Sequence, residues 1–419
     1  MQLPGNIKIE TERIGRRFMF AFEKKILDYM EKHLDLIIFV MVTIGGFLIR
    51  ASLRHYISKD AASDLLPWYS QIKDNGGFQG LGKQVGTYNM FYQFLIAIMT
   101  YLPIKPLYAY KILSCVFDYL LAGAAAWFAY SFPKENDSSE KRKWNSITVY
   151  SLIIFSPVVI LNSAQWAQCD SIYVFFVLMA FALFCKEKYL LSFVFYGIAA
   201  AFKLQAVFLL PFLLFIYFVK RSFSILYFLA APISMCIVNI PCLIMGRRMS
   251  EIFSLYLDQT NEYSAISMNY PSFWLLLKDV PVDGQVELYK DAAILFTICV
   301  LAGWMISWIV NRIQLSRRNM LYMAFILTFT CVLFLPTMHE RYGYIYEILG
   351  VLILFFNKKT LPLLLSLNGI SLMTYGFYLN DRIINLGTLA VINFAIYVFY
   401  GFILTKQIME DKNKITMES

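Results

Sequence analysis

Four side chains with ionisable or hydrogen-bonding groups stand side by side at residues 339–342, between two apolar segments of the sequence. They are His339, Glu340, Arg341 and Tyr342. An arginine side chain is always charged, so at the mouth of an apolar helix it needs an anionic partner. Glu340 is one candidate, but neighbouring side chains on a helix do not face each other. We therefore expect Arg341 and His339 to be available for the phosphate group of a ligand.

A carboxylate that could act as a base lies in the loop after the first apolar segment. Asp60 precedes the sequence LLPWY, whose Trp68 and Tyr69 rings favour the depth of lipid headgroups. A carboxylate held there, partly out of water, can take a proton from a hydroxyl group as a general base. Asp64 is one helical turn further on and could serve instead. Both could also be ordinary loop acids, one of them capping the helix that follows.

Polar residues interrupt the apolar segments at two further places. Gln165, Gln168 and Asp170 lie at the junction of two such segments, where amides and carboxylates can hydrogen-bond to sugar hydroxyls. Asp170 could instead cap the next helix. Lys203 and Gln205 lie inside AAAFKLQAVFLLPFLLF. A buried ammonium group there suits a phosphate group, although the side chain could also extend its charge to the membrane surface.

The elements that must position these residues are apolar helices. The chain is 59% hydrophobic and 16% charged, whereas soluble proteins have about 45–50% apolar and about 25% charged residues. Apolar segments of about 17–25 residues span a bilayer as helices, and the alternating pattern of a membrane β-barrel is absent from the sequence. We predict an all-α polytopic helical bundle with about 12 transmembrane helices, whose backbone groups pair within each helix. The predicted spans cover residues 34–50, 107–131, 145–162, 170–185, 189–203, 205–219, 223–244, 287–310, 320–337, 343–357, 361–379 and 383–404.

The orientation of the chain depends on residues 89–103, which are apolar but short for a span. We interpret them as an interfacial or re-entrant segment. Most of the 37 Lys and Arg residues then fall on the side of the N-terminal arm, the bias expected of the cytoplasmic side. Both termini are predicted to be cytoplasmic, and the polar clusters to open on the outer face of the cell membrane. The predicted parts are a basic amphipathic arm (1–33), one transmembrane domain (34–404, with a first external loop at 51–106) and a tail (405–419).

Several classes of site are disfavoured by what the sequence lacks. It has no P-loop, no GxGxxG motif opening a helix and no HExxH motif. The predicted cytoplasmic pieces are too short to fold a nucleotide-binding domain, so a water-soluble nucleotide donor is not expected. The seven cysteines form no CxxC pair, which argues against zinc or haem ligation.

Five motifs, in this order and spacing, resemble the GT-C superfamily of polytopic glycosyltransferases. More narrowly, the chain is similar to the bacterial proteins related to GPI mannosyltransferase II. The resemblance covers most of the chain. It is carried by SKDAASDLLPWY (58–69), KILSCVFDYLLA (111–122), SPVVILNSAQWAQCDSIY (156–173), GIAAAFKLQAVFLLPF (197–212) and LPTMHERYGY (335–344).

The resemblance implies inverting transfer of a hexose of mannose, glucose or galactose type. The donor would be a polyprenyl-phosphate sugar, and the acceptor an envelope glycan or glycolipid at the outer face of the bilayer; nucleic acid is not an expected partner. Asp60 would be the general base, with Asp64 in reserve, and Arg341, His339 and Lys203 would hold the lipid phosphate. The residues expected to bind sugar or acceptor are Gln165, Trp166, Gln168, Asp170, Gln205, Glu340 and Tyr342.

The chain departs from the pattern of these relatives at three places. Ala167 replaces a glycine, a change that we expect to be harmless, and YNMFY at 88–92 lacks the expected prolines. Lys59 precedes Asp60 and could weaken it as a base, which would favour Asp64. Some members of the superfamily hold a divalent metal with several acids; because this loop offers only Asp60, Asp64 and Asp74, a metal cofactor is an open alternative that is not favoured.

Two other functions fit a polytopic chain. A polysaccharide polymerase or ligase also uses lipid-linked sugar, and its external arginines could correspond to Arg247 and Arg248. A secondary transporter could use Lys203 as its substrate or ion site, but such proteins are built from internal repeats. The two halves of this sequence share no motif, so a transporter is the weaker alternative.

Overall fold

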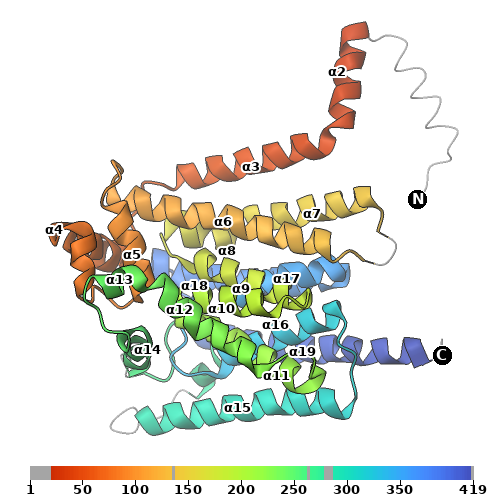
Figure 1. Ribbon diagram of the computed structural model, residues 1–419. Helices are drawn as coiled ribbons and strands as arrows, with labels where there is room; N and C mark the ends of the chain where they lie inside the picture. Colours follow the sequence, from red (N-terminus) through yellow and green to blue (C-terminus); the bar gives the residue numbers. More distant parts are fainter. Residues whose placement is uncertain (1–19, 135–136, 262–264, 278–285, 417–419) are drawn as a thin grey trace, which may run out of the picture.

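Figure 1 shows the computed structural model of the chain, which describes residues 20–134, 137–261, 265–277 and 286–416. All regular elements within these ranges are helical, so the predicted all-α fold is confirmed. The α-helices of the first half are α2 (Ala21–Lys32), α3 (Leu34–Ser52), α4 (Leu66–Asp74), α5 (Met90–Met99), α6 (Pro106–Ser131), α7 (Ser139–Ile154), α8 (Pro157–Ile160), α9 (Asp170–Cys185) and α10 (Tyr189–Phe202). Those of the second half are α11 (Leu210–Lys220), α12 (Ala230–Val238), α13 (Ile240–Ile244), α14 (Glu251–Asn261), α15 (Val286–Val310), α16 (Arg317–Phe334), α17 (Tyr344–Phe356), α18 (Leu361–Asn380) and α19 (Leu386–Thr416).

Short π-helical and 3-10 segments connect the longer helices. The π-helical segments are η2 (Ala61–Leu65) and η4 (Leu161–Gln165). The 3-10 segments are η3 (Gly77–Gly82), η5 (Leu204–Leu209), η6 (Ile225–Leu229), η7 (Phe273–Leu276) and η8 (Lys358–Thr360).

Five helices of the described chain are long and apolar enough to cross a membrane. They are Leu34–Ser52, Pro106–Ser131, Val286–Val310, Lys358–Asn380 and Leu386–Glu410. A sixth candidate is the bent pair Ser139–Ile154 and Pro157–Gln165, which is kinked by 49°. Several other predicted spans form apolar helices of only 10–17 residues. The chain is therefore a polytopic membrane protein, while the predicted number of about twelve spans stays a prediction.

Residues 89–103 do not run the length of the bundle. α5 has ten residues and is therefore about 15 Å long, about half of the ~30 Å hydrocarbon layer. In Figure 1, α4 and α5 lie at the left end of the bundle, where α3 ends and α6 begins. The end of α6, the start of α7 and the C-terminal end of α19 lie at the opposite end.

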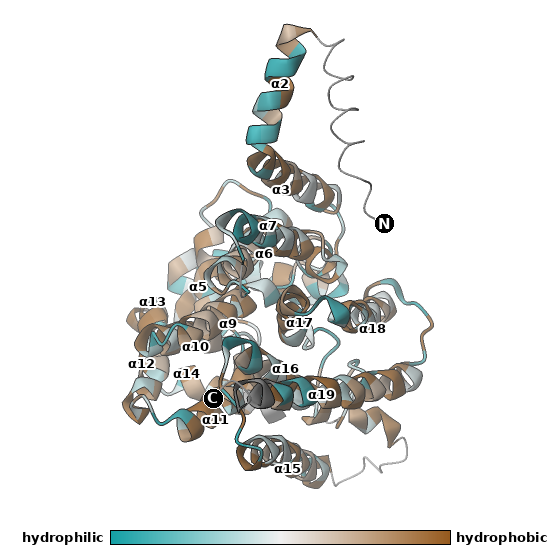
Figure 2. Ribbon diagram, turned by 90° about the vertical axis from the view of Figure 1, so that its right-hand side faces the viewer, coloured by the Kyte–Doolittle hydropathy of each residue, from teal (hydrophilic) through white to brown (hydrophobic). Residues whose placement is uncertain are grey.

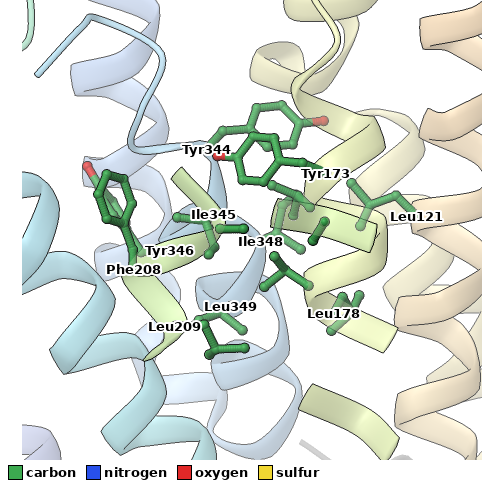
Figure 3. Close-up of a cluster of buried hydrophobic side chains, with 14 of the residues drawn as sticks. Leu121, Tyr173, Leu178, Phe208, Leu209, Tyr344, Ile345, Tyr346, Ile348 and Leu349 are labelled. Carbon is green, nitrogen blue, oxygen red and sulfur yellow. The ribbon is translucent and has the colours of Figure 1, made fainter. Parts of the chain in front are cut away.

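α16 and α17 form the centre of the bundle. Every residue of α16 from Asn319 to Phe334 is buried, as are nearly all residues of α17. Figure 3 shows Ile348 and Leu349 of α17 packed near Leu178 of α9, with Leu121 of α6 beside them. Because α16 and α17 are central, the turn that joins them at residues 335–343 lies inside the bundle, near one of its ends.

The helices at the periphery are apolar on their outer surfaces. α3 exposes Phe47 and Leu48, and α15 exposes Leu295 and Ile298, as expected of surfaces that contact lipid. α2 extends away from the bundle, and it turns mostly hydrophilic residues toward the viewer in Figure 2. Residues 1–19 of the predicted amphipathic arm lie outside the described residues, and its contact with the membrane surface stays a prediction.

Candidate active site

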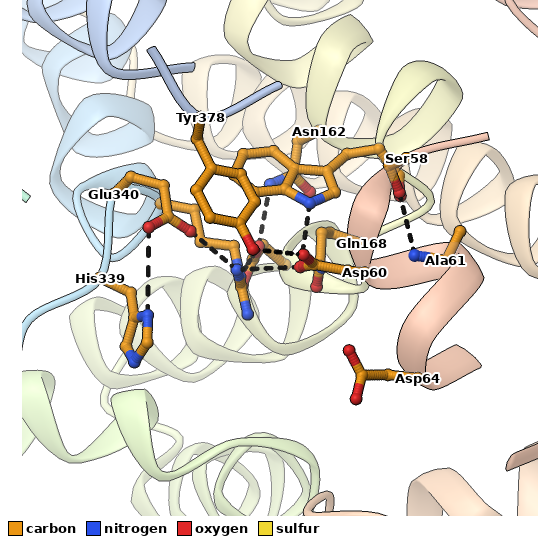
Figure 4. A network of polar contacts seen from close by, with 12 residues as sticks. Ser58, Asp60, Ala61, Asp64, Asn162, Gln168, His339, Glu340 and Tyr378 are labelled. Atoms are coloured by element: carbon orange, nitrogen blue, oxygen red, sulfur yellow. Dashed lines mark hydrogen bonds and ion pairs between the residues drawn. The ribbon is translucent and has the colours of Figure 1, made fainter. Parts of the chain in front are cut away.

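Five polar segments that are distant in sequence meet around one cavity of about 590 Å³. They are the segment before η2, the turn between η4 and α9, the junction of α10 with η5, the α16–α17 turn and the end of α18. Their cavity-lining polar residues include Asp60, Gln168, Lys203, Arg341 and Tyr378. Figure 4 shows Asp60 at the middle of the resulting network of polar contacts.

The Asp60 carboxylate is fixed by three hydrogen-bond donors. Trp166 Nε1 and Gln168 Nε2 both donate to Asp60 Oδ2, at 3.0 and 2.6 Å. The Tyr378 hydroxyl donates to Asp60 Oδ1 at 2.6 Å (Figure 4). The predicted base is therefore oriented by two groups from the turn that follows η4 and by one group from α18. An ionised carboxylate has about four lone-pair sites, so one site on Oδ1 is left for a further donor.

Tyr88 fixes the orientation of the Gln168 amide. Its hydroxyl donates to Gln168 Oε1 at 3.0 Å, which directs the amide nitrogen of Gln168 toward Asp60. Burial raises the pKa of Tyr88 to about 12, so that it remains a donor at neutral pH. Tyr88 belongs to the YNMFY segment, and sequence reasoning did not assign it to the site.

Arg341 lies among three carboxylates. Its Nη1 atom is 3.0 Å from Glu340 Oε1 and 3.5 Å from Asp60 Oδ2, and its Nε atom is 3.6 Å from Asp170 Oδ2. The expectation that Arg341 and Glu340 would not pair is wrong. It assumed a helix, whereas residues 335–343 form an irregular turn in which neighbouring side chains can converge.

Lys203 and Asp170 form a buried ion pair. Lys203 Nζ is 2.6 Å from Asp170 Oδ1, and each side chain is at most 4% exposed. Asp170 Oδ2 also accepts a hydrogen bond from Asn162 Nδ2 at 2.8 Å. Asp170 is thus a partner of cations rather than a side-chain cap, since Cys169 occupies the N-cap position of α9. Lys203 does not extend its charge to the membrane surface; it lines the cavity, while its partner Asp170 lies behind the lining.

His339 is neutral in this environment. Burial, together with the charges of Arg341 and Lys203, lowers the pKa of His339 to about 3. Its Nδ1 atom lies 4.0 Å from Glu340 Oε2 (Figure 4). Burial raises the pKa of Glu340, and the charge of Arg341 opposes that shift. At neutral pH, His339 can therefore exchange hydrogen bonds with a ligand but brings no positive charge to it.

The backbone beside the network departs from regular helix in two places. Asp60 stands directly before the π-helical η2, and Trp166 directly after the π-helical η4. Such widened turns occur frequently at functional sites. Ala167 has a φ of 66° in the left-handed region, where a side chain costs about 1–2 kcal/mol and glycine costs none. The expectation that alanine is harmless there overlooked this conformational reason for glycine.

One comparison with known proteins identifies the family. The model of glycosyltransferase family 87 matches residues 87–339, which is more than half of the chain. The chain belongs to glycosyltransferase family 87. The predicted membership in the GT-C type of glycosyltransferase is thereby confirmed, whereas the narrower likeness to GPI mannosyltransferase II is not. No curated protein matches the chain.

The region that matches family 87 includes only part of the polar network. Tyr88, Gln168 and Lys203 fall inside it, whereas Asp60 and Arg341 fall outside. Membership therefore establishes a membrane glycosyltransferase and leaves the role of each site residue as a prediction.

The other predicted residues of this family 87 protein are divided between the cavity and its surroundings. Gln205, Tyr342 and Asp64 line the cavity. Trp166 does not, but it donates to Asp60, and the Arg341 guanidinium lies 5.4 Å from its ring centre. With Trp166, four predicted residues are not among the lining residues, the other three being Gln165, Asp170 and Glu340.

The two acidic alternatives near Asp60 have different surroundings. Asp64 is partly buried at the cavity wall, and its printed hydrogen bond comes from its neighbour, because Ser63 Oγ donates to Asp64 Oδ2 at 2.6 Å. Figure 4 shows it apart from the network around Asp60. Lys59 pairs with Asp381 at 2.5 Å rather than with Asp60. Lys59, which was expected to weaken Asp60 as a base, therefore has a different carboxylate as its partner.

Two residues of the network were not assigned to the site from the sequence. Asn162 begins the polar cluster NSAQWAQCDS, in which only later residues were named, whereas Tyr378 lies near the end of the apolar α18. Tyr378 reaches the site through the fold alone. Among the described residues, no three His, Cys, Asp or Glu side chains are grouped as ligands of a metal ion would be.

Proposed function

We propose that this glycosyltransferase moves a hexose from a polyprenyl-phosphate sugar to a glycan or glycolipid at the non-cytoplasmic face of the cell membrane. The supporting observation is the mixed lining of one cavity. Asp60 and Arg341 line it together with Val207, Ile294 and Leu335, which belong to or adjoin apolar helices. A lipid-linked sugar needs this combination, because its phosphate and sugar are polar while its chain is not.

Asp60 is the general base in this proposal. The acceptor hydroxyl approaches the remaining lone pair of Asp60 Oδ1, and its proton passes to that atom as its oxygen bonds to C1 of the donor sugar. Tyr378, Trp166 and Gln168 keep the carboxylate in place while this occurs. Such preorganisation lets the correct geometry form without further ordering.

The bond between C1 and the phosphate oxygen breaks on the opposite side of the sugar. The electron pair stays on the phosphate, which becomes more negative as the polyprenyl phosphate leaves. Arg341 and Lys203 line the cavity and can stabilise that charge. Both cations already have carboxylate partners, so the phosphate would share Arg341 with Glu340 and Asp170 rather than meet a bare cation. His339 adds a neutral hydrogen bond.

The alternatives are less well supported. Membership in a glycosyltransferase family argues against a transporter. Of the two arginines that would suit a polymerase, Arg247 is buried, where its Nε atom pairs with Glu251 at 2.5 Å and its Nη2 atom donates to Gln84 at 2.7 Å. A structural role therefore accounts for Arg247, and Arg248 is left as an exposed side chain.

The direct test is a transfer assay with the full-length protein in lipid nanodiscs. Synthetic polyprenyl-phosphate mannose, glucose and galactose are each supplied with glycan and glycolipid acceptors, and nucleotide sugars with the same acceptors serve as the control. Addition of one hexose from one lipid donor, with inversion at C1, is the expected result. Transfer from a nucleotide sugar alone would contradict the proposal, and stepwise addition of many units would favour the polymerase.

A further inference from the structure

One side of α6 is polar although the helix is otherwise apolar. Lys111 and Asp118 are seven residues apart, so they lie on the same side of the helix, and both are buried. They belong to the motif KILSCVFDYLLA, and neither lines the cavity. Charges buried at such depth are costly and need partners. Lys111 binds backbone carbonyls and Asp118 binds side chains, and these partners belong to or adjoin the segments that carry the polar network.

Lys111 holds the segment that leads to Asp60. Its Nζ atom donates to the carbonyl oxygens of Leu53 and Tyr56 at 2.8 and 2.7 Å. Leu53 is the C-cap of α3, and its carbonyl also accepts from the Tyr56 amide, so the ammonium group binds both carbonyls of the turn that follows the helix. Asp60 follows Tyr56 by four residues, and Lys111 therefore fixes where this segment leaves the membrane helix.

Asp118 holds the other half of the network. Ser163 of η4 donates from Oγ to Asp118 Oδ2 at 2.5 Å. The same oxygen accepts from Arg50 Nε at 2.8 Å, which ties the end of α3 to this point as well. Ser163 precedes Trp166 by three residues, so Asp118 fixes the turn that presents the donors to Asp60.

The two segments also meet each other directly. Ser58 Oγ donates to the carbonyl oxygen of Trp166 at 2.8 Å and accepts from the amide of Ala61 at 3.1 Å (Figure 4). Asp60 lies between Ser58 and Ala61. The polar face of α6 thus holds the segment that carries Asp60 and the segment that carries its donor Trp166. Ser58 links these two segments directly.

We propose that Lys111 and Asp118 are positioning residues, which set Asp60 against Trp166 and Gln168 through the buried polar face of α6. This proposal rests on the role of Asp60 in the proposed function. Neither residue touches the substrates. A displacement of about 1 Å at a reacting group can cost about 100-fold in rate, so their loss lowers kcat and leaves the KM of the donor largely unchanged.

The test compares Lys111→Met, Lys111→Arg and Ser163→Ala with the wild-type protein in nanodiscs. Steady-state kinetics with the lipid donor gives kcat and KM per folded molecule. Hydrogen–deuterium exchange reports backbone protection of residues 53–65 and 161–168. Lys111→Met is expected to lower kcat about 100-fold and to raise exchange in 53–65 selectively, and Lys111→Arg is expected to restore both. Ser163→Ala leaves the Arg50–Asp118 pair intact, and is expected to raise exchange mainly in 161–168 with a smaller loss of kcat.

Tyr397→Phe is the matched control. Tyr397 is buried and hydrogen-bonds to Trp304 and Thr330 on other helices. It is expected to lower stability without changing kcat or the exchange of 53–65. If Lys111→Met resembles this control, with kcat per folded molecule unchanged, Lys111 has only a structural role and the proposal is wrong. Exchange is measured without substrate, so an inactive wild type would reject the lipid donor while the exchange data still decide whether the α6 face holds these segments.

Discussion

Arg341 Nη1 lies 3.5 Å from Asp60 Oδ2, so the cation predicted to bind phosphate and the predicted base are neighbours in one cavity. The same guanidinium group also contacts Glu340. A donor phosphate that approaches Arg341 thereby brings its sugar close to Asp60. The contact also means that a change at Arg341 can disturb the base, and this must be separated from an effect on the donor.

Replacing Asp60 by asparagine removes the proton acceptor but retains the hydrogen-bonding shape. We expect transfer to fall by about 100- to 10,000-fold, the range of a general base, with normal amounts of protein in the membrane. Asp64→Asn is the matched control and is expected to have little effect, because Asp64 lies apart from the network. The reverse pattern in the nanodisc assay would assign the base to Asp64.

Arg341→Lys keeps the charge but loses the planar group that contacts several carboxylates. We expect the KM of the lipid donor to rise about tenfold, the order expected from one charge-assisted hydrogen bond. Arg248→Lys, at an exposed side chain, is the control. An unchanged donor KM together with a reduced kcat would place Arg341 with the base rather than with the phosphate.

His339 should make the protein less stable in acid. Its pKa is about 3 in the folded protein and near 6.5 when unfolded, so the unfolded chain binds more protons between these values. Stability is therefore complete above pH 6.5 and declines as the pH falls toward 3, by up to about 1.4 kcal/mol per pH unit. The His339→Asn variant lacks this titration. In thermal unfolding at pH 7 and pH 5, wild type should lose more stability than the variant; equal losses would show that His339 is not buried as a neutral group.

The arrangement of α3, α5 and α6 predicts which residues share a side of the membrane. A reporter fused after Ser139 should lie on the same, cytoplasmic, side as one at the C-terminus. A cysteine introduced at the exposed Ser63 should react with an impermeant reagent from the opposite side. If Ser139 and position 63 are accessible from the same side, residues 89–103 cross the membrane and the proposed face of the active site is wrong.

Ala167 should tolerate glycine better than a branched residue. Its φ of 66° is costly for alanine by about 1–2 kcal/mol, whereas glycine adds backbone entropy of about 0.5–1 kcal/mol to the unfolded chain. Ala167→Gly is therefore expected to leave the melting temperature unchanged or slightly raised. Ala167→Val is expected to lower it strongly, because a β-branched residue rarely adopts this conformation. Equal melting temperatures for the two variants would contradict this account.

The sequence by itself determined the fold class and most of the helices. Long apolar segments must satisfy their backbone groups internally in lipid, and this leaves helices as the local solution. α9, predicted at 170–185, spans Asp170–Cys185. Asp60, Lys203 and Arg341 could also be found from sequence, since ionisable residues stand out among apolar neighbours.

Only the tertiary structure decided which of these groups are partners. Lys203 and Asp170 are 33 residues apart, and Tyr378 and Asp60 are separated by 318, so no local pattern records either contact. Arg341 pairs with Glu340 because residues 335–343 form an irregular turn, in which the side chains of consecutive residues can face each other, as they cannot on a helix. Asp60 is distinguished from Asp64 for the same reason. The two acids are one helical turn apart in sequence and both line the cavity. The turn after η4 and the end of α18 bring three hydrogen-bond donors to Asp60, whereas Asp64 accepts from its neighbour Ser63.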